Sequence, residues 1–139
     1  AGFIEKKERK KVEMHNWGTI AAGSIFIDRK NARSAVESIN RGVEMIKAGQ
    51  PLAIFPEGTR SKSSEMARFK AGSLKLALRS EAVIVPLTVC GSYRIFEETG
   101  RITPVKVTLV VHPPVETAGL KEEERKELAE KLEDIVRNS

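Results

Sequence analysis

Short apolar runs alternate with amphipathic stretches along this 139-residue sequence, and this alternation is what most constrains the fold. The runs LAIFP (52–56) and AVIVPLTV (82–89) are apolar on both faces, so each is predicted to be a buried strand. The run PVKVTLVVHPP (104–114) alternates with a period of two, which predicts a half-buried strand. GSIFIDRK (23–30) is a further β-rich run, and GFI (2–4) is typical of the end of a strand.

Three amphipathic stretches lie between or after these runs, at residues 31–51, 69–80 and 120–138. Asn31 is a suitable N-cap for the first, and the acids early in the third suit the helix dipole. The side chains expected to face the body of the protein are Val36, Ile39, Val43 and Ile46, then Leu74, Ala77 and Leu78, then Leu128, Leu132, Ile135 and Val136. Strands alternating with helices predict an α/β fold with a mixed, largely parallel sheet flanked by helices, formed by residues 1–139 as a single domain.

The net charge is +5, which favours anionic partners such as phosphate esters, lipid headgroups, CoA or nucleic acid. Aromatic residues make up only 5%, and acids interleave with bases in EKKERKK (5–11), so a nucleic-acid binder is disfavoured. No apolar stretch approaches the roughly 20 residues of a membrane span, and no signal-peptide pattern is visible. The single Cys90 excludes an intrachain disulfide, and its apolar surroundings predict a small buried side chain.

Charged residues follow two of the predicted strands, as the pair Asp28-Arg29 and the stretch Glu57–Arg60. Ligands of parallel sheets bind beyond the carboxyl ends of the strands, where both stretches are expected to lie. Gly58 permits a sharp turn and a close approach of the backbone to a ligand. Two guanidiniums, the Thr59 hydroxyl and exposed backbone N–H groups would suit a phosphate. Glu57 would orient an arginine or accept a hydrogen bond from a ligand hydroxyl; the alternative is a strand-end turn with a surface salt bridge.

The two histidines offer little support for a catalytic site. His15 and His112 have no acid nearby at a known motif spacing, and His112 is expected to close a strand. The sequence contains no G-x-G-x-x-G, no P-loop, no G-x-S-x-G and no zinc-ligand spacing. Nucleotide-dependent phosphoryl transfer is therefore disfavoured.

Four segments together resemble the glycerophospholipid acyltransferases, most of all those that act on 1-acyl-glycerol 3-phosphate. These segments are GSIFIDR (23–29), FPEGTRS (55–61), FKAG (69–72) and IVPLTVCGSY (84–93), in the family's order and spacing. The resemblance implies a glycerol-3-phosphate acyltransferase-like α/β fold and acyl transfer from acyl-CoA or acyl carrier protein to a glycerol hydroxyl. It also implies no metal or bound cofactor, and a peripheral location on the cytoplasmic face of a membrane.

By the same resemblance, the acceptor, lysophosphatidate or glycerol 3-phosphate, is held through its phosphate, and no nucleic acid is bound. The residues implied to bind that phosphate are Arg29, Glu57, Gly58, Thr59 and Arg60. Those implied to shape the site are Gly23, Phe26, Asp28, Pro56 and Pro86.

The family's catalytic block, H-x-x-x-x-D, is not found in these residues. Ile20 stands where an aspartate would follow His15, and Thr117 where one would follow His112. In the family the histidine is the general base and the aspartate orients it, so the dyad is expected upstream, and an N-terminally truncated domain fragment is predicted. Polar residues at 9, 13 and 15 stand where the family tends to be apolar. The alternatives are a degenerate paralogue and a non-catalytic module that binds phospholipids or phosphate esters.

Overall fold

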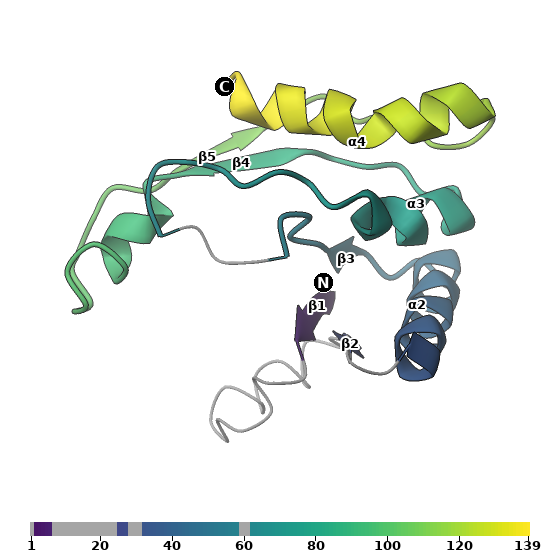
Figure 1. Cartoon of the computed structure of the whole chain (residues 1–139), viewed down its shortest axis with the longest axis horizontal. Helices are drawn as coiled ribbons and strands as arrows, with labels where there is room; N and C mark the ends of the chain where they lie inside the picture. Colours follow the sequence, from purple (N-terminus) through teal and green to yellow (C-terminus); the bar gives the residue numbers. More distant parts are fainter. Residues whose placement is uncertain (1, 7–24, 28–31, 59–61) are drawn as a thin grey trace. The chain divides into compact units, whose positions relative to one another are not determined.

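The computed structural model describes residues 2–6, 25–27, 32–58 and 62–139 (Figure 1). The chain divides into two compact units, and each is described by itself. The first unit comprises the residues up to Phe55 together with Lys75–Ala82, and the second comprises Pro56–Leu74 and Val83–Ser139. The expectation of one domain over the whole sequence stays a prediction.

A parallel sheet of three strands forms the centre of the first unit. Strand β1 (Gly2–Lys6) lies between β2 (Ile25–Ile27) and β3 (Leu52–Ala53), and it is parallel to both. Helix α2 (Ala32–Lys47) contacts β2 and also α3 (Lys75–Ser80). Val43 of α2 is buried, as are Leu76 and Ala77 of α3, so the apolar faces of the two helices contribute to the core.

The second unit combines an antiparallel strand pair with a long helix. Strand β4 (Leu87–Cys90) pairs with β5 (Thr108–Val111), and an isolated bridge between Ile84 and Val115 extends the pairing. Two short 3₁₀ helices, η2 (Ala71–Leu74) and η3 (Ser92–Ile95), complete the unit with α4 (Glu122–Arg137). Helix α4 runs along the strand pair and contacts β4 and η2 (Figure 1).

The helix predicted at residues 120–138 is confirmed as α4, and its predicted apolar face is confirmed as well. Leu128 and Leu132 are each buried, while Ile135 and Val136 are half-buried. The first turn carries three glutamates, and the Glu124 carboxylate accepts a 2.7 Å hydrogen bond from the backbone N–H of Lys121. This contact satisfies one of the N–H groups that every helix start leaves without a partner.

The fold class is confirmed at the level of a mixed α/β protein. Its parallel part is the sheet of β1, β2 and β3, whereas β4 and β5 are antiparallel. Among the described residues, no helix combines the length and the apolar character that crossing a membrane would require.

The predicted burial of two strand regions is wrong. In LAIFP only Leu52 and Ala53 form a strand, both half-buried, and Phe55 is 65% exposed. In AVIVPLTV the strand begins only at Leu87, and the apolar side chains at 83, 85, 87 and 89 are exposed. The Thr88 hydroxyl bonds to the backbone oxygen of Val136 in α4, which turns the polar side of β4 inward.

Three smaller expectations also need correction. Cys90, at the end of β4, is exposed instead of buried, and Val36 of α2 is also exposed. The helix predicted at 69–80 is divided into η2 and α3, because Ser73 donates both its amide and its hydroxyl to the Lys70 oxygen and so tightens the first turn. Leu74 and Ala77 are nonetheless buried as predicted.

Candidate functional site

The chain turns sharply after β3, at the beginning of the proposed phosphate-binding stretch. Pro56 and Glu57 form the turn, and Gly58 has a φ angle of +66°. This φ lies in the left-handed region, where a side chain at Cβ would crowd the backbone and where glycine has no such cost. The local sequence therefore has a physical reason to place glycine directly after Glu57.

Hydrogen bonds connect the turn to a segment about ten residues further along the chain. The Oε2 atom of Glu57 accepts a 2.8 Å hydrogen bond from the backbone N–H of Ala67, and the oxygen of Pro56 accepts one of 3.0 Å from Lys70. One carboxylate oxygen of Glu57 is thus used within the protein to hold the two ends of this loop together. That Glu57 orients an arginine, or accepts a hydrogen bond from a ligand hydroxyl, stays a prediction.

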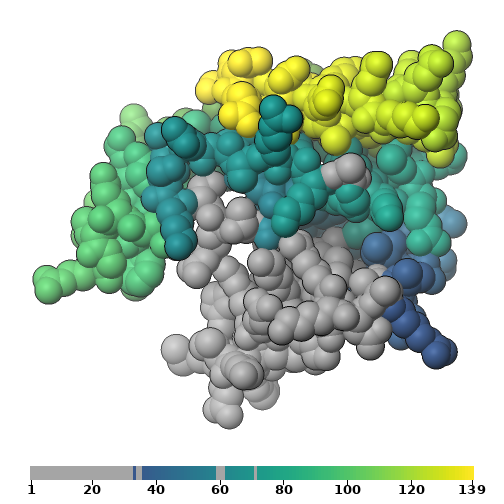
Figure 2. All heavy atoms as spheres, in the orientation of Figure 1, coloured from purple at the N-terminus to yellow at the C-terminus, as the bar shows by residue number. Residues whose placement is uncertain are grey.

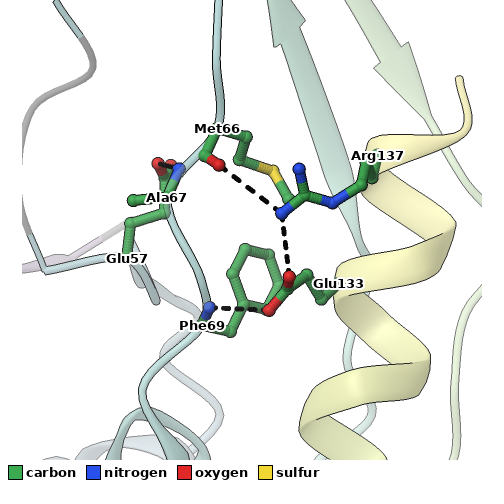
Figure 3. Close-up of polar contacts among 6 residues, drawn as sticks. All are labelled: Glu57, Met66, Ala67, Phe69, Glu133 and Arg137. Carbon is green, nitrogen blue, oxygen red and sulfur yellow. Dashed lines mark hydrogen bonds and ion pairs between the residues drawn. The ribbon is translucent and has the colours of Figure 1, made fainter.

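Helix α4 holds the same segment through a second carboxylate (Figure 3). The Oε2 atom of Glu133 accepts a 2.8 Å hydrogen bond from the backbone N–H of Phe69. Its Oε1 atom accepts a 2.8 Å hydrogen bond from Arg137, whose guanidinium also lies 3.5 Å from the backbone oxygen of Met66. Segment 66–70 is therefore tied both to the turn at Glu57 and to the C-terminal end of α4.

The protein environment favours the charged form of Glu133. The hydrogen bond from the Phe69 N–H is the largest cause that lowers the pKa of this carboxyl, and the hydrogen bond from Arg137 is the next. Desolvation acts in the opposite direction and is outweighed. The Glu133 side chain is only 16% exposed, so both of its oxygens are engaged in a largely enclosed position.

His112 makes a hydrogen-bonded contact within the second unit. His112 directly follows β5, as predicted, and its Nε2 lies 2.8 Å from the Thr88 hydroxyl. Thr88 in turn bonds to the backbone oxygen of Val136 and receives a hydrogen bond from the Ser139 hydroxyl. In the contact between Thr88 and His112, the donor and acceptor roles depend on the tautomer of the ring.

The structure describes half of the residues predicted to form the site. Pro56, Glu57 and Gly58 lie in the turn, and Phe26 is the middle residue of β2, opposite Glu5 of β1. Pro86 is buried beside β4, where its oxygen accepts a hydrogen bond from the His112 N–H. The remaining predicted residues, Gly23, Asp28, Arg29, Thr59 and Arg60, lie outside the described residues.

Two residues that sequence reasoning missed, Glu133 and Arg137, contact the loop that follows the turn. Their spacing of four residues on one helix marks a possible ion pair, but it does not point to a partner 64 residues away. In the part of the chain that the structure describes, no group of three or more His, Cys, Asp or Glu side chains is placed to hold a metal ion.

Comparison with known proteins confirms the resemblance seen in the sequence. The model of the Acyltransferase family matches residues 2–90, a span that includes both charged stretches. The 1-acyl-sn-glycerol-3-phosphate acyltransferase of Borreliella burgdorferi is 29% identical over 135 residues, which cover 96% of this chain and 54% of that protein. The enzyme of that name from Saccharomyces cerevisiae is 33% identical over 133 residues, covering 93% of this chain and 44% of the relative.

A solved structure shares the fold. The crystal structure of the 1-acyl-sn-glycerophosphate (LPA) acyltransferase PlsC from Thermotoga maritima superimposes with a TM-score of 0.80 at 29% identity, covering 99% of this chain and 54% of that one. The chain thus spans about half the length of these relatives, or slightly less. Since the family match covers more than half of its residues, this chain belongs to the acyltransferase family.

Proposed function

We propose that this chain is the acceptor-binding part of an enzyme of phospholipid biosynthesis, which converts 1-acyl-glycerol 3-phosphate into phosphatidate. The observation that carries the proposal is the family match over residues 2–90, which includes the stretch Phe55–Ser61. The relatives named as 1-acyl-sn-glycerol-3-phosphate acyltransferases support this choice of acceptor. Because both acceptor and product are lipids, the enzyme would work at the cytoplasmic face of a membrane, as a peripheral protein.

In the proposed reaction, the free hydroxyl of the acceptor attacks the carbonyl carbon of an acyl thioester. A new C–O ester bond forms, the C–S bond breaks, and the thiol of CoA or of acyl carrier protein leaves with the proton that the hydroxyl gave up to a general base. Arg29 and Arg60 would hold the acceptor phosphate through paired N–H donors, with the Thr59 hydroxyl and the Gly58 N–H beside them. Glu57 would keep the turn that presents these donors, supported by its contact with Ala67.

A general base is needed to take the hydroxyl proton, and the two histidines of this sequence do not fit that role. Neither is followed by aspartate at the fifth position, and His112 is engaged with Thr88. We therefore place the base outside these 139 residues. The missing motif also favours the second candidate function, a non-catalytic module that binds phosphate esters.

The phosphate-binding role is tested by titrating the chain with glycerol 3-phosphate in a calorimeter. Arg60→Ala should weaken binding by roughly 1.5–3 kcal/mol, the scale of a charge-assisted hydrogen bond. Arg60→Lys should recover only part of this loss, because an ammonium group cannot reproduce the planar fork of a guanidinium. Equal affinities for wild type and Arg60→Ala would mean that Arg60 is a surface residue without a role in binding.

The acyltransferase and the non-catalytic module are separated by restoring the base. The chain alone should show no turnover of a radiolabelled acyl thioester, since loss of a positioned base costs about 10²–10⁴-fold. A chimera that joins this chain to the unmatched portion of the Thermotoga maritima protein should regain transfer to lysophosphatidate. A chimera that binds glycerol 3-phosphate as well as the chain does, but transfers no acyl group, would favour the non-catalytic module.

A further inference from the structure

Segment 66–70 lies outside the helices and strands, yet it is held at several points. Its Ala67 amide is bound by the Glu57 carboxylate, and its Phe69 amide by the Glu133 carboxylate. Figure 3 draws Glu57 on one side of the segment and the pair Glu133–Arg137 on the other. We call Glu133 and Arg137, with their contacts to Phe69 and Met66, the α4 clamp.

We propose that Glu133, together with Arg137, is a positioning residue that fixes Glu57 in the acceptor site through the backbone of residues 66–69. The proposal rests on the function proposed above, because that function makes the turn at Glu57 part of the acceptor site. The Ala67 and Phe69 amides are only two residues apart, so at most about 7 Å of backbone separates them. Fixing the amide of Phe69 therefore restricts where the amide of Ala67, and the carboxylate bound to it, can lie.

The place of Glu133 in α4 supports a role beyond helix stability. It lies four residues before Arg137, the last residue of α4, near the C-terminus of the helix, where the dipole disfavours a negative charge. The two hydrogen bonds from Phe69 and Arg137 offset that cost, and Arg137 itself suits the dipole. Both oxygens are used, one for the loop and one for the guanidinium, so the carboxylate is fixed in its orientation.

The clamp also explains why a loop could keep the precision that phosphate recognition needs. A site on a loop is accurate only if surrounding contacts hold the loop in one conformation. Here the contacts come from a helix whose own position is set by buried Leu128 and Leu132. The packed face of α4 thereby sets the location of Glu133, and Glu133 sets that of segment 66–69.

The test measures amide hydrogen exchange by NMR in the full chain, for wild type and for Glu133→Ala. Exchange at Phe69 should accelerate about tenfold because its acceptor is removed. Exchange at Ala67 should accelerate as well, although its own acceptor, Glu57, is unchanged. Faster exchange at Phe69 with no change at Ala67 would overturn the proposal, since Glu133 would then serve only its own contact. Glu130→Ala, on the exposed face of the same helix, is the matched control and should change neither amide.

Affinity for glycerol 3-phosphate supplies the second readout. Glu133→Ala should weaken binding several-fold. Glu133→Gln should weaken it less, because the amide oxygen still accepts a hydrogen bond from Phe69. Glu130→Ala should leave the affinity unchanged. If Glu133→Ala unfolds, Glu133→Leu, which also removes the acceptor of the Phe69 amide, carries both measurements. Unaltered affinity in the Glu133 variants would refute the positioning role. If wild type itself does not bind glycerol 3-phosphate, the proposed function fails, and the exchange at Ala67 still decides whether Glu133 positions Glu57.

Discussion

Gly58 shows how one residue sets the backbone at the proposed site. With its φ angle at +66°, replacement by alanine should cost about 1 kcal/mol of unfolding free energy, because a Cβ is disfavoured in that region. The control is Gly72→Ala in η2, where no atom lies within 4 Å of an added Cβ. That variant should be neutral or slightly stabilising, because alanine loses less backbone entropy. Urea unfolding curves of both variants check this, and equal midpoints would contradict it.

Glu133 is a second single residue with a predicted effect, a pH-dependent contribution to the free energy of unfolding. Its pKa is lowered in the folded protein, so its contribution is fully present above the ordinary value of 4.5 and is lost as the pH falls through the lowered value. Glu133→Gln should therefore be less stable than wild type by about 1 kcal/mol at pH 7. The difference should shrink as the pH falls through the lowered pKa of Glu133, because the wild-type carboxyl then loses its charge as well.

Denaturant unfolding at a series of pH values measures that difference. Glu130→Gln removes one negative charge from the exposed face of the same helix and provides the baseline. A difference between wild type and Glu133→Gln that stays constant from pH 7 to pH 3 would show that the carboxylate charge is not what Phe69 and Arg137 recognise.

At the scale of elements, β4 is attached to the end of α4 by a polar contact. The Val136 oxygen belongs to the last turn of the helix, where carbonyls have no partner within the helix, and the Thr88 hydroxyl supplies one. Thr88→Val keeps the shape of the side chain but removes this bond and the one with His112. It should cost about 1–2 kcal/mol in the unfolding free energy.

The matched control for Thr88 is Thr108→Val on the neighbouring strand, where the side chain is exposed. It should change the midpoint of urea unfolding little, since strands favour valine and no buried bond is lost. If the two variants lose the same stability, the contact between β4 and α4 contributes nothing specific.

The sequence predicted the elements whose pattern is local and missed the contacts that depend on partners far along the chain. Leu128 and Leu132 lie four residues apart on one helix, so the apolar spacing within α4 was enough to predict it. Nothing in AVIVPLTV reveals that Thr88 would face inward while Leu87 and Val89 stay exposed, because that choice depends on α4, about fifty residues later. The site behaves in the same way: the Glu57 turn was predictable, and the clamp by Glu133 was not.

At the scale of the whole molecule, the surface combines excess positive charge with exposed apolar side chains. The chain carries a net charge of +5, and helix α4, drawn in yellow-green to yellow in Figure 2, contains both acidic and basic residues. Leu87 and Val89 of β4, with Leu109 and Val111 of β5, are exposed apolar residues on the strand pair. Charge and apolar surface predict different modes of membrane binding, which experiment can separate.

We expect weak, salt-reversible association with anionic vesicles and none with neutral ones. The segment from Glu5 to Glu13 contains five basic and three acidic residues, so it supplies a net charge of only 5 − 3 = +2. Near an anionic surface each uncompensated cation contributes roughly 1 kcal/mol, and the attraction fades within a Debye length of about 8 Å at physiological salt. Co-sedimentation with vesicles at low and high salt measures the association. Tight binding to neutral vesicles that resists salt would reverse this expectation, and it would indicate an apolar contact with the lipid, for which the exposed side chains of β4 and β5 are candidates.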